Sequence, residues 1–183
     1  DFNFVCRLME EFGIYYYFEH TSSKHTMVFC DGPSCHQKAP GLDAVPLLPV
    51  TMESRRDRQQ FDVWSSARAF QTGKDAVNSY WWGKPTADNL GQSDKHGNYA
   101  HGSLETYDYD TTFKAKSWAE RYAKVRIEAV QALDDHRHAV GSAPSVFPGA
   151  KLTTELVSPA SDNKEWLALR CTHSYVDQSF ISG

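Results

Sequence analysis

The hydrophobic pattern of the first thirty residues changes from a helical period to a strand period. Four apolar side chains recur at i, i+3, i+4 and i+7, and so share one face of a helix: Val5, Leu8, Met9 and Phe12. Asp1 or Asn3 can cap the start of this helix, and Gly13 stands where a left-handed residue ends one. The pattern predicts a short helix within the first twelve residues.

After Gly13 the period becomes two. Residues 14–19 alternate between two faces, residues 20–23 form a polar turn, and residues 25–30 alternate again. The sequence therefore predicts a β-hairpin that ends at Asp31-Gly32-Pro33. A two-stranded hairpin with one short helix is marginally stable by itself, so we expect this segment to pack on another surface.

A second helical pattern covers about residues 112–135. Its apolar stripe has offsets of 0, 4, 7, 11 and 15 from the first member: Trp118, Tyr122, Val125, Ala129 and Leu133. Asp110 can cap this helix, and the stretch "DDHRH" with Gly141 ends it. We expect the Trp118 stripe to be buried against a β-barrel.

The remaining pattern is mostly that of strands. Strands are expected within 61–70, 77–82, 145–158 and 165–177, with a long polar loop at 83–102 and a turn at 159–164. Two helices in a chain of strands without a βαβ rhythm favour a mainly β or α+β fold, with a barrel or sandwich decorated by two amphipathic helices. The proline-rich stretch 37–50 predicts a connector between a helix-plus-hairpin layer at 1–36 and a β-barrel domain at 51–183.

Composition narrows the possible partners. The chain has 183 residues, 40% of them hydrophobic and 23% charged, which is enough to bury a core. The formal net charge is −4 and no large basic block occurs, which argues against nucleic acid as the main partner. No apolar run approaches the length of a membrane span.

The four cysteines are irregularly spaced, and we expect them to be reduced and mostly buried. Cys30, Cys35 and His36 could form half of a zinc site. No second pair of ligands at metal spacing follows them, so we predict no metal site.

Catalytic motifs are missing from the sequence, including the P-loop, H-E-x-x-H, G-x-S-x-G and G-x-G-x-x-G patterns. "SDNK" at 161–164 is interpreted as a hairpin turn. His136 and His138 could chelate a metal from a strand, but are interpreted as surface residues near a helix end. "YWWGKPT" at 80–86 could be a stacking platform, but core and interface packing is favoured, because neighbouring residues of a strand face opposite ways. We assign no catalytic, cofactor-binding or metal residues and predict that the chain is not an enzyme.

The opening stretch "DFNFVCRLMEEFGIYYYFEHTSSKHTMVFCD" resembles a segment of the VgrG (valine-glycine repeat) spike proteins of type VI secretion, with His36 in the place of that family's next histidine. Later stretches resemble the family in the same order: "LETYDYD", "WAERYAKVRIEAVQA", "HAVGSAPSVFPGAKLTTEL" and "EWLALRCTHSYVDQ", the last with His173. Residues 51–104 match only loosely.

The resemblance implies a phage tail hub-like fold with β-barrel domains and a structural role in the base of a tail spike that carries effectors to target cells. It implies a homotrimer that docks on an Hcp-type tube ring, with baseplate proteins, a PAAR-type spike-tip protein and effectors as further partners. It also implies assembly in the bacterial cytoplasm, delivery through the type VI apparatus, and further segments before and after this chain. Two alternatives stay open, namely a hub of a contractile phage tail and an effector domain with enzyme or toxin activity.

Overall fold

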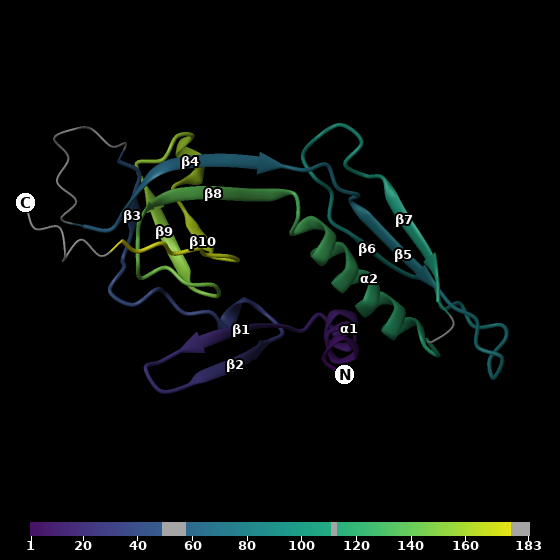
Figure 1. Ribbon diagram of the computed structural model, residues 1–183. Coiled ribbons are helices and arrows are strands. Elements are labelled where there is room, and N and C mark those ends of the chain that lie inside the picture. The colour runs from purple at the N-terminus through teal and green to yellow at the C-terminus, as the bar shows by residue number, and fades with distance from the viewer. Residues whose placement is uncertain (49–57, 111–112, 177–183) are drawn as a thin grey trace, which may run out of the picture. The chain divides into compact units, whose positions relative to one another are not determined.

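The computed structural model describes residues 1–48, 58–110 and 113–176. These ranges contain two α-helices, ten β-strands and two short 3₁₀ helices (Figure 1), which confirms the predicted mainly β class with two helices. Their strands form four small sheets of two or three strands each. The chain groups into two compact units: unit 1 is Asp1–Tyr15 with Ser66–His138, and unit 2 is Tyr16–Ser65 with Ala139–Gly183.

Unit 1 holds both α-helices and one three-stranded sheet. The central strand, β5, pairs antiparallel with β6 and parallel with β7. The elements are α1 (Phe2–Phe12), β5 (Lys74–Asn78), β6 (Gly91–Asp94), β7 (Glu105–Tyr109) and α2 (Lys116–Gln131). Strands β4 (Gln60–Arg68) and β8 (Asp135–Ser142) pair with each other, and each has residues that group with both units.

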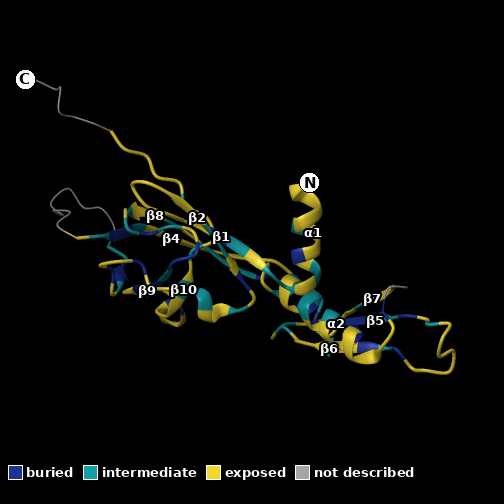
Figure 2. Ribbon diagram, turned by 90° about the horizontal axis from the view of Figure 1, so that it is seen from below, coloured by how far each residue is buried: buried dark blue, intermediate teal, exposed yellow. Residues whose placement is uncertain are grey.

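Helix α1 has the predicted ends. The Asp1 carboxylate accepts a hydrogen bond from the Phe4 backbone N–H at 3.4 Å, and Gly13 closes the helix with a φ of 73°. Met9 is its one buried residue, and Figure 2 shows the rest of the helix largely exposed. The apolar face of α1 therefore forms as predicted but remains mostly in contact with solvent.

Helix α2 differs from its prediction at its start and on its face. Its N-cap is Ala115, which makes no side-chain capping bond, so the predicted cap at Asp110 is wrong. The buried residues are Ala119, Ala123 and Ile127, while Trp118 is 53% exposed, so the predicted burial of the Trp118 stripe is also wrong.

Close approach of α2 to the sheet explains this choice of face. A Cβ placed on Gly91 of β6 would lie only 2.2 Å from the backbone carbon of Ala119. At that separation only small side chains fit between the helix and the strand, so the alanine face packs inward and Trp118 is turned outward. The core of unit 1 combines Ala119 and Ala123 with Val77 and Phe113.

Unit 2 combines a hairpin with a second three-stranded sheet. Strand β9 lies between β10, with which it is antiparallel, and β3, with which it is parallel. The strands are β1 (Tyr15–His20), β2 (His25–Cys30), β3 (Val45–Pro46), β9 (Lys151–Glu155) and β10 (Glu165–Leu167). The hairpin of β1 and β2 lies where the alternation predicted it.

The core of unit 2 uses part of the predicted connector. Its buried hydrophobic residues are Ala39, Leu42, Val45, Phe61, Val146, Ala150 and Leu152. Three of them come from the proline-rich stretch 37–50, so the described part of this stretch is packed into the core. In the same stretch, Lys38 forms an isolated parallel β-bridge with Lys151. The domain boundaries at 36 and 50 and the closed barrel remain predictions.

Strands β6 and β8 occur where the sequence pattern did not indicate a strand. Strand β8 takes up the polar stretch after α2, and β6 lies inside the predicted loop 83–102. Both are rich in polar side chains, so their strand state depends on backbone pairing with β4 and β5, which local alternation does not reveal. None of the helices in the described ranges is both long and apolar enough to cross a bilayer.

Candidate functional site

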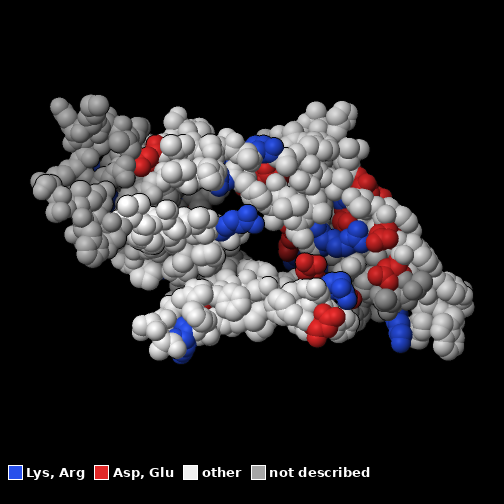
Figure 3. Space-filling model, viewed as in Figure 1, with Lys and Arg blue, Asp and Glu red and all other residues white. Residues whose placement is uncertain are grey.

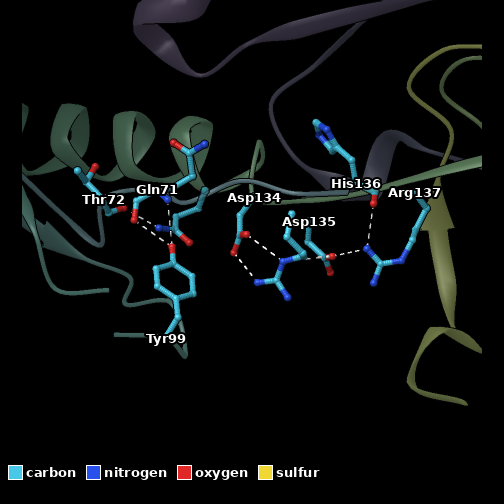
Figure 4. A network of polar contacts seen from close by, with 9 residues as sticks. Gln71, Thr72, Tyr99, Asp134, Asp135, His136 and Arg137 are labelled. Atoms are coloured by element: carbon cyan, nitrogen blue, oxygen red, sulfur yellow. Dashed lines mark hydrogen bonds and ion pairs between the residues drawn. The ribbon is translucent and has the colours of Figure 1, made fainter. Parts of the chain in front are cut away.

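A polar network surrounds the junction of α2 and β8 in unit 1 (Figure 4). The Arg68 guanidinium donates to both carboxylate oxygens of Asp134, at 2.9 and 2.8 Å, and these hydrogen bonds hold the pKa of Asp134 below its usual value. Arg137 donates to the Asp135 carboxylate and to the backbone carbonyl of His136. Each arginine is thus paired with a carboxylate, so the network stabilises the junction that follows the end of the helix.

The histidines considered as metal ligands, His136 and His138, lie on β8, the strand that follows α2. In Figure 4 the ring of His136 points away from the polar network. Within the described ranges, no third His, Cys, Asp or Glu gathers with the pair at ligand distance. The structure therefore does not favour a metal site there.

A second ionic cluster lies between β5, β7 and α2. Asp75 is 2% exposed, and its Oδ2 is 3.4 Å from Nε of Arg126, whose Nη1 donates to Asp108 at 2.7 Å. Burial raises the pKa of Asp75 and the Arg126 charge opposes that rise, whereas the hydrogen bond from Arg126 lowers the pKa of Asp108. Oδ1 of Asp75 has no hydrogen-bond partner. No sequence pattern indicated this buried carboxylate, because β5 was expected only from Val77 onward.

The "SDNK" stretch is a turn, as predicted. Residues Ala160–Asp162 form a 3₁₀ helix, and Asp162 is 1% exposed. Its Oδ2 accepts from Nε1 of Trp64 at 2.9 Å, and its backbone oxygen accepts from Nε1 of Trp166 at 2.9 Å. Asp162 therefore fixes two indole rings of the unit 2 core.

The aromatic stretch at 80–86 forms no joint platform. Trp82 is 82% exposed, so its predicted use in the core is wrong, while an interface use remains a prediction. Nζ of Lys84 lies 5.9 Å from the ring centre of Trp81, and the Lys84 N–H donates to the Trp81 carbonyl at 3.0 Å. The stretch is a turn that leaves Trp82 in solvent.

Large apolar side chains are exposed in both units. Unit 1 exposes Phe2, Phe4, Val5, Leu8, Phe12, Tyr15, Phe70, Tyr80, Trp82, Leu104, Tyr107, Tyr109, Trp118 and Leu133. Unit 2 exposes Phe18, Phe29, Val63, Val140, Leu156, Leu167, Leu169, Tyr175 and Val176. On the face drawn in Figure 3, charged side chains gather over α2 and its neighbouring strands. Exposed apolar residues that share one face, as several of those on α1 do, are typical of surfaces that bind partners.

The oxidation state of two cysteines in unit 2 differs from the prediction that all four are reduced. Cys30, the last residue of β2, and Cys35 form a disulfide with a Cα–Cα separation of 5.9 Å, so they are not both reduced. The turn Asp31-Gly32-Pro33 between them was the available signal, because it brings the two cysteines together. Cys6 and Cys171 are free thiols, as expected. His36 lies beside the disulfide.

Comparison with known proteins identifies a family for the whole chain. The family model described as phage tail baseplate hub (GPD) matches residues 1–179. The type VI secretion system spike protein VgrG1b of Pseudomonas aeruginosa is 32% identical over 182 residues, which is 100% of this chain and 24% of that protein. The spike protein VgrG1a of the same organism is 30% identical over 182 residues, which is 100% of this chain and 28% of that protein.

The chain thus spans about a quarter of the length of the curated relatives it matches. The resemblance of the opening stretch to the VgrG spike proteins is confirmed, and it extends over the whole chain. The helix-plus-hairpin start, the mainly β composition and these matches lead to one conclusion: the chain belongs to the phage tail baseplate hub family.

Proposed function

We propose that this chain is a structural part of a type VI secretion tail spike, in the region that forms the baseplate hub, and that it has no catalytic role. The match to the hub family over residues 1–179, together with matches to spike proteins over the entire chain, carries this proposal. The delivery of effectors to target cells, by a particle assembled in the bacterial cytoplasm, is part of the same proposal.

The exposed face of α1 supports a role in assembly. Phe4 is 53%, Val5 44% and Leu8 40% exposed on a helix whose apolar residues share one face. Such a face is normally buried against another element, and a helix that leaves it open is suited to bind a partner. Further copies of the protein in a homotrimer, an Hcp-type tube ring and baseplate proteins are the proposed partners. Effectors and a PAAR-type tip protein would be carried by the spike.

Genetic complementation tests the proposal. In a bacterium that encodes the full-length protein, the amount of tube protein released into the medium is measured after deletion of its gene. Wild-type protein should restore release, and the double variant Phe4→Ser/Leu8→Ser should not, although it accumulates to a normal level. The matched control is Glu10→Gln, a change of an exposed polar residue on the same helix, and it should restore release.

Unchanged release after the deletion, with no other spike gene present, would contradict the secretion role. Full restoration by Phe4→Ser/Leu8→Ser would contradict the use of the α1 face.

A hub of a contractile phage tail is the second candidate, because the matching family is described as a phage tail baseplate hub. The neighbouring genes distinguish the two. Capsid and tail-fibre genes would favour the phage hub, whereas genes for a type VI sheath and membrane complex would favour the secretion spike.

A further inference from the structure

The hairpin end of unit 2 brings three metal-binding side chains together. One ligand atom each from Cys30, Cys35 and His36 lies within 4.8 Å of the other two. Cys30 is 2% and His36 7% exposed, so two of the three are buried. The chemistry of the set, two sulfurs and one imidazole nitrogen, is that preferred by zinc.

The local structure fixes the position of His36. Its Nδ1 is 2.9 Å from the backbone oxygen of Gly149, to which it donates. Its ring centre is 5.3 Å from that of Tyr17, whose hydroxyl donates to the Cys35 carbonyl at 3.3 Å. Metal-binding histidines characteristically donate one ring N–H to a carbonyl or carboxylate, which orients the other nitrogen toward the ion.

Gly149 allows this close packing. Its φ is +92°, and a Cβ there would lie 2.4 Å from Cδ2 of Tyr17. A side chain at this position would displace the tyrosine ring from beside His36, so the carbonyl that orients the imidazole and the ring that covers it depend on a glycine.

We propose that the reduced chain binds a zinc-class divalent ion through the Sγ atoms of Cys30 and Cys35 and the imidazole of His36, with water in the fourth position. The Cys30–Cys35 disulfide and the bound ion are alternative states of this site, since a cysteine coordinates zinc through its thiolate and a disulfide has none. A site with three protein ligands and one open position is an established zinc arrangement, so the missing second cysteine pair does not exclude it. The sequence-based prediction of no metal site then applies only to the disulfide state.

The small size of the loop closed by the disulfide is consistent with a bond that can be reduced to allow the ion to bind. The two cysteines are separated by five positions, and a bridge over so short a loop removes little entropy from the unfolded chain. In a reducing compartment the dithiol is the expected form. Oxidation by a small disulfide, such as glutathione disulfide, removes two electrons from the two thiolates and forms the S–S bond. The oxidant becomes two thiols by taking up two protons, and the ion is released.

Cobalt binding to the reduced 183-residue chain tests the site directly. The chain is reduced with a phosphine under argon, freed of reductant and titrated with Co²⁺. We expect one ion per chain, with visible absorption of tetrahedral cobalt and sulfur-to-cobalt charge-transfer bands, both removed by Zn²⁺. Cys30→Ser, Cys35→Ser and His36→Asn should each weaken binding by at least about tenfold, because even partners outside the ligand shell have effects of that size. Cys171→Ser is the matched control and should bind as the wild type does.

Oxidation and thiol labelling add tests that need no variant. Glutathione disulfide should release one Zn²⁺ for each Cys30–Cys35 bridge formed. Zn²⁺ should also protect Cys30 and Cys35, but not Cys171, from alkylation, as mapped by peptide mass spectrometry. Absence of thiolate-to-cobalt bands in the reduced wild type, or equal alkylation of Cys30 and Cys35 with and without Zn²⁺, would overturn the proposal. The assembly role is tested separately, by the release of tube protein, so neither result would decide it.

Discussion

The two helices of unit 1 use their apolar residues in opposite ways. Helix α1 has the clearer apolar face, yet Met9 is its only buried residue. Helix α2 has an aromatic stripe on one side and small residues on another, and it buries the small ones, Ala119 and Ala123, together with Ile127. Periodicity therefore predicts that a helix forms, whereas the distance to the neighbouring backbone decides which face of the helix is buried.

The largest expected effect comes from filling the gap between α2 and β6. Gly91→Val places a side chain where a Cβ alone would lie 2.2 Å from the Ala119 backbone carbon. Backbone atoms on both sides cannot move aside as a side chain can, so we expect a loss of more than about 4 kcal/mol in unfolding free energy, or failure to fold. Urea denaturation followed by circular dichroism measures this loss.

Gly32→Ala is the control for that experiment, because nothing lies within 4 Å of a Cβ built at Gly32. It should leave stability within about 0.5 kcal/mol of the wild type. Equal stability of the two variants would show that α2 does not approach β6 closely.

The second effect concerns the buried face of α2. Ile127 is 1% exposed, so Ile127→Ala should lower the unfolding free energy by about 2–5 kcal/mol through lost burial and a residual cavity. The measurement is again a urea titration at neutral pH. A loss close to zero would place Ile127 on the exposed face of α2, and would contradict the claim that α2 buries this face.

A pH-dependent effect is expected from Asp75, beneath α2. Because burial raises its pKa, the folded chain binds a proton there more readily than the unfolded chain. The stability contributed by this group therefore decreases as pH rises from the ordinary carboxyl range through the raised pKa of Asp75. Asp75→Asn removes this dependence, so the wild type should gain stability relative to the variant as pH falls through that window.

Parallel urea titrations of the wild type and Asp75→Asn between neutral and acidic pH provide the readout. The difference cancels the other carboxylates, such as Asp108 and Asp134, whose lowered pKa values weaken both proteins in acid. A wild type that loses stability relative to Asp75→Asn in acid would mean that the Arg126 attraction outweighs burial.

The smallest effect is predicted for Trp118. Its side chain is 53% exposed and meets the Phe12 ring edge-to-face at 6.5 Å, so Trp118→Ala should cost less than about 1 kcal/mol. Thermal unfolding of the variant beside Ile127→Ala checks this directly. A loss as large as that of Ile127→Ala would restore the aromatic stripe as the buried face.

The sequence pattern correctly predicted the features that depend on interactions between residues close together in the chain. The Asp1 cap, the left-handed Gly13, the hairpin of β1 and β2, and the 160–162 turn depend on neighbouring residues, and each lies where the sequence placed it. The resemblance to spike proteins added the family, which periodicity alone could not provide. These features belong to the first and last parts of the chain, where the signals were strongest.

Tertiary contacts determined the rest. Strands β6 and β8 form because β5 and β4 offer backbone hydrogen bonds to polar stretches. These stretches have no alternation of hydrophobic and polar residues that would indicate a strand. The ionic cluster of Asp75 and Arg126 joins residues far apart in sequence. Only the Cys30–Cys35 bridge could have been found locally, from the turn between its ends.

We have proposed that the chain is a structural element of an assembled hub. The most direct test is the mass of the full-length protein at micromolar concentration, measured by light scattering coupled to size exclusion. The hub role predicts a particle of three copies, and Phe4→Ser/Leu8→Ser should weaken it where the α1 face forms a copy-to-copy contact. A full-length protein that stays monomeric at that concentration would contradict the hub assignment.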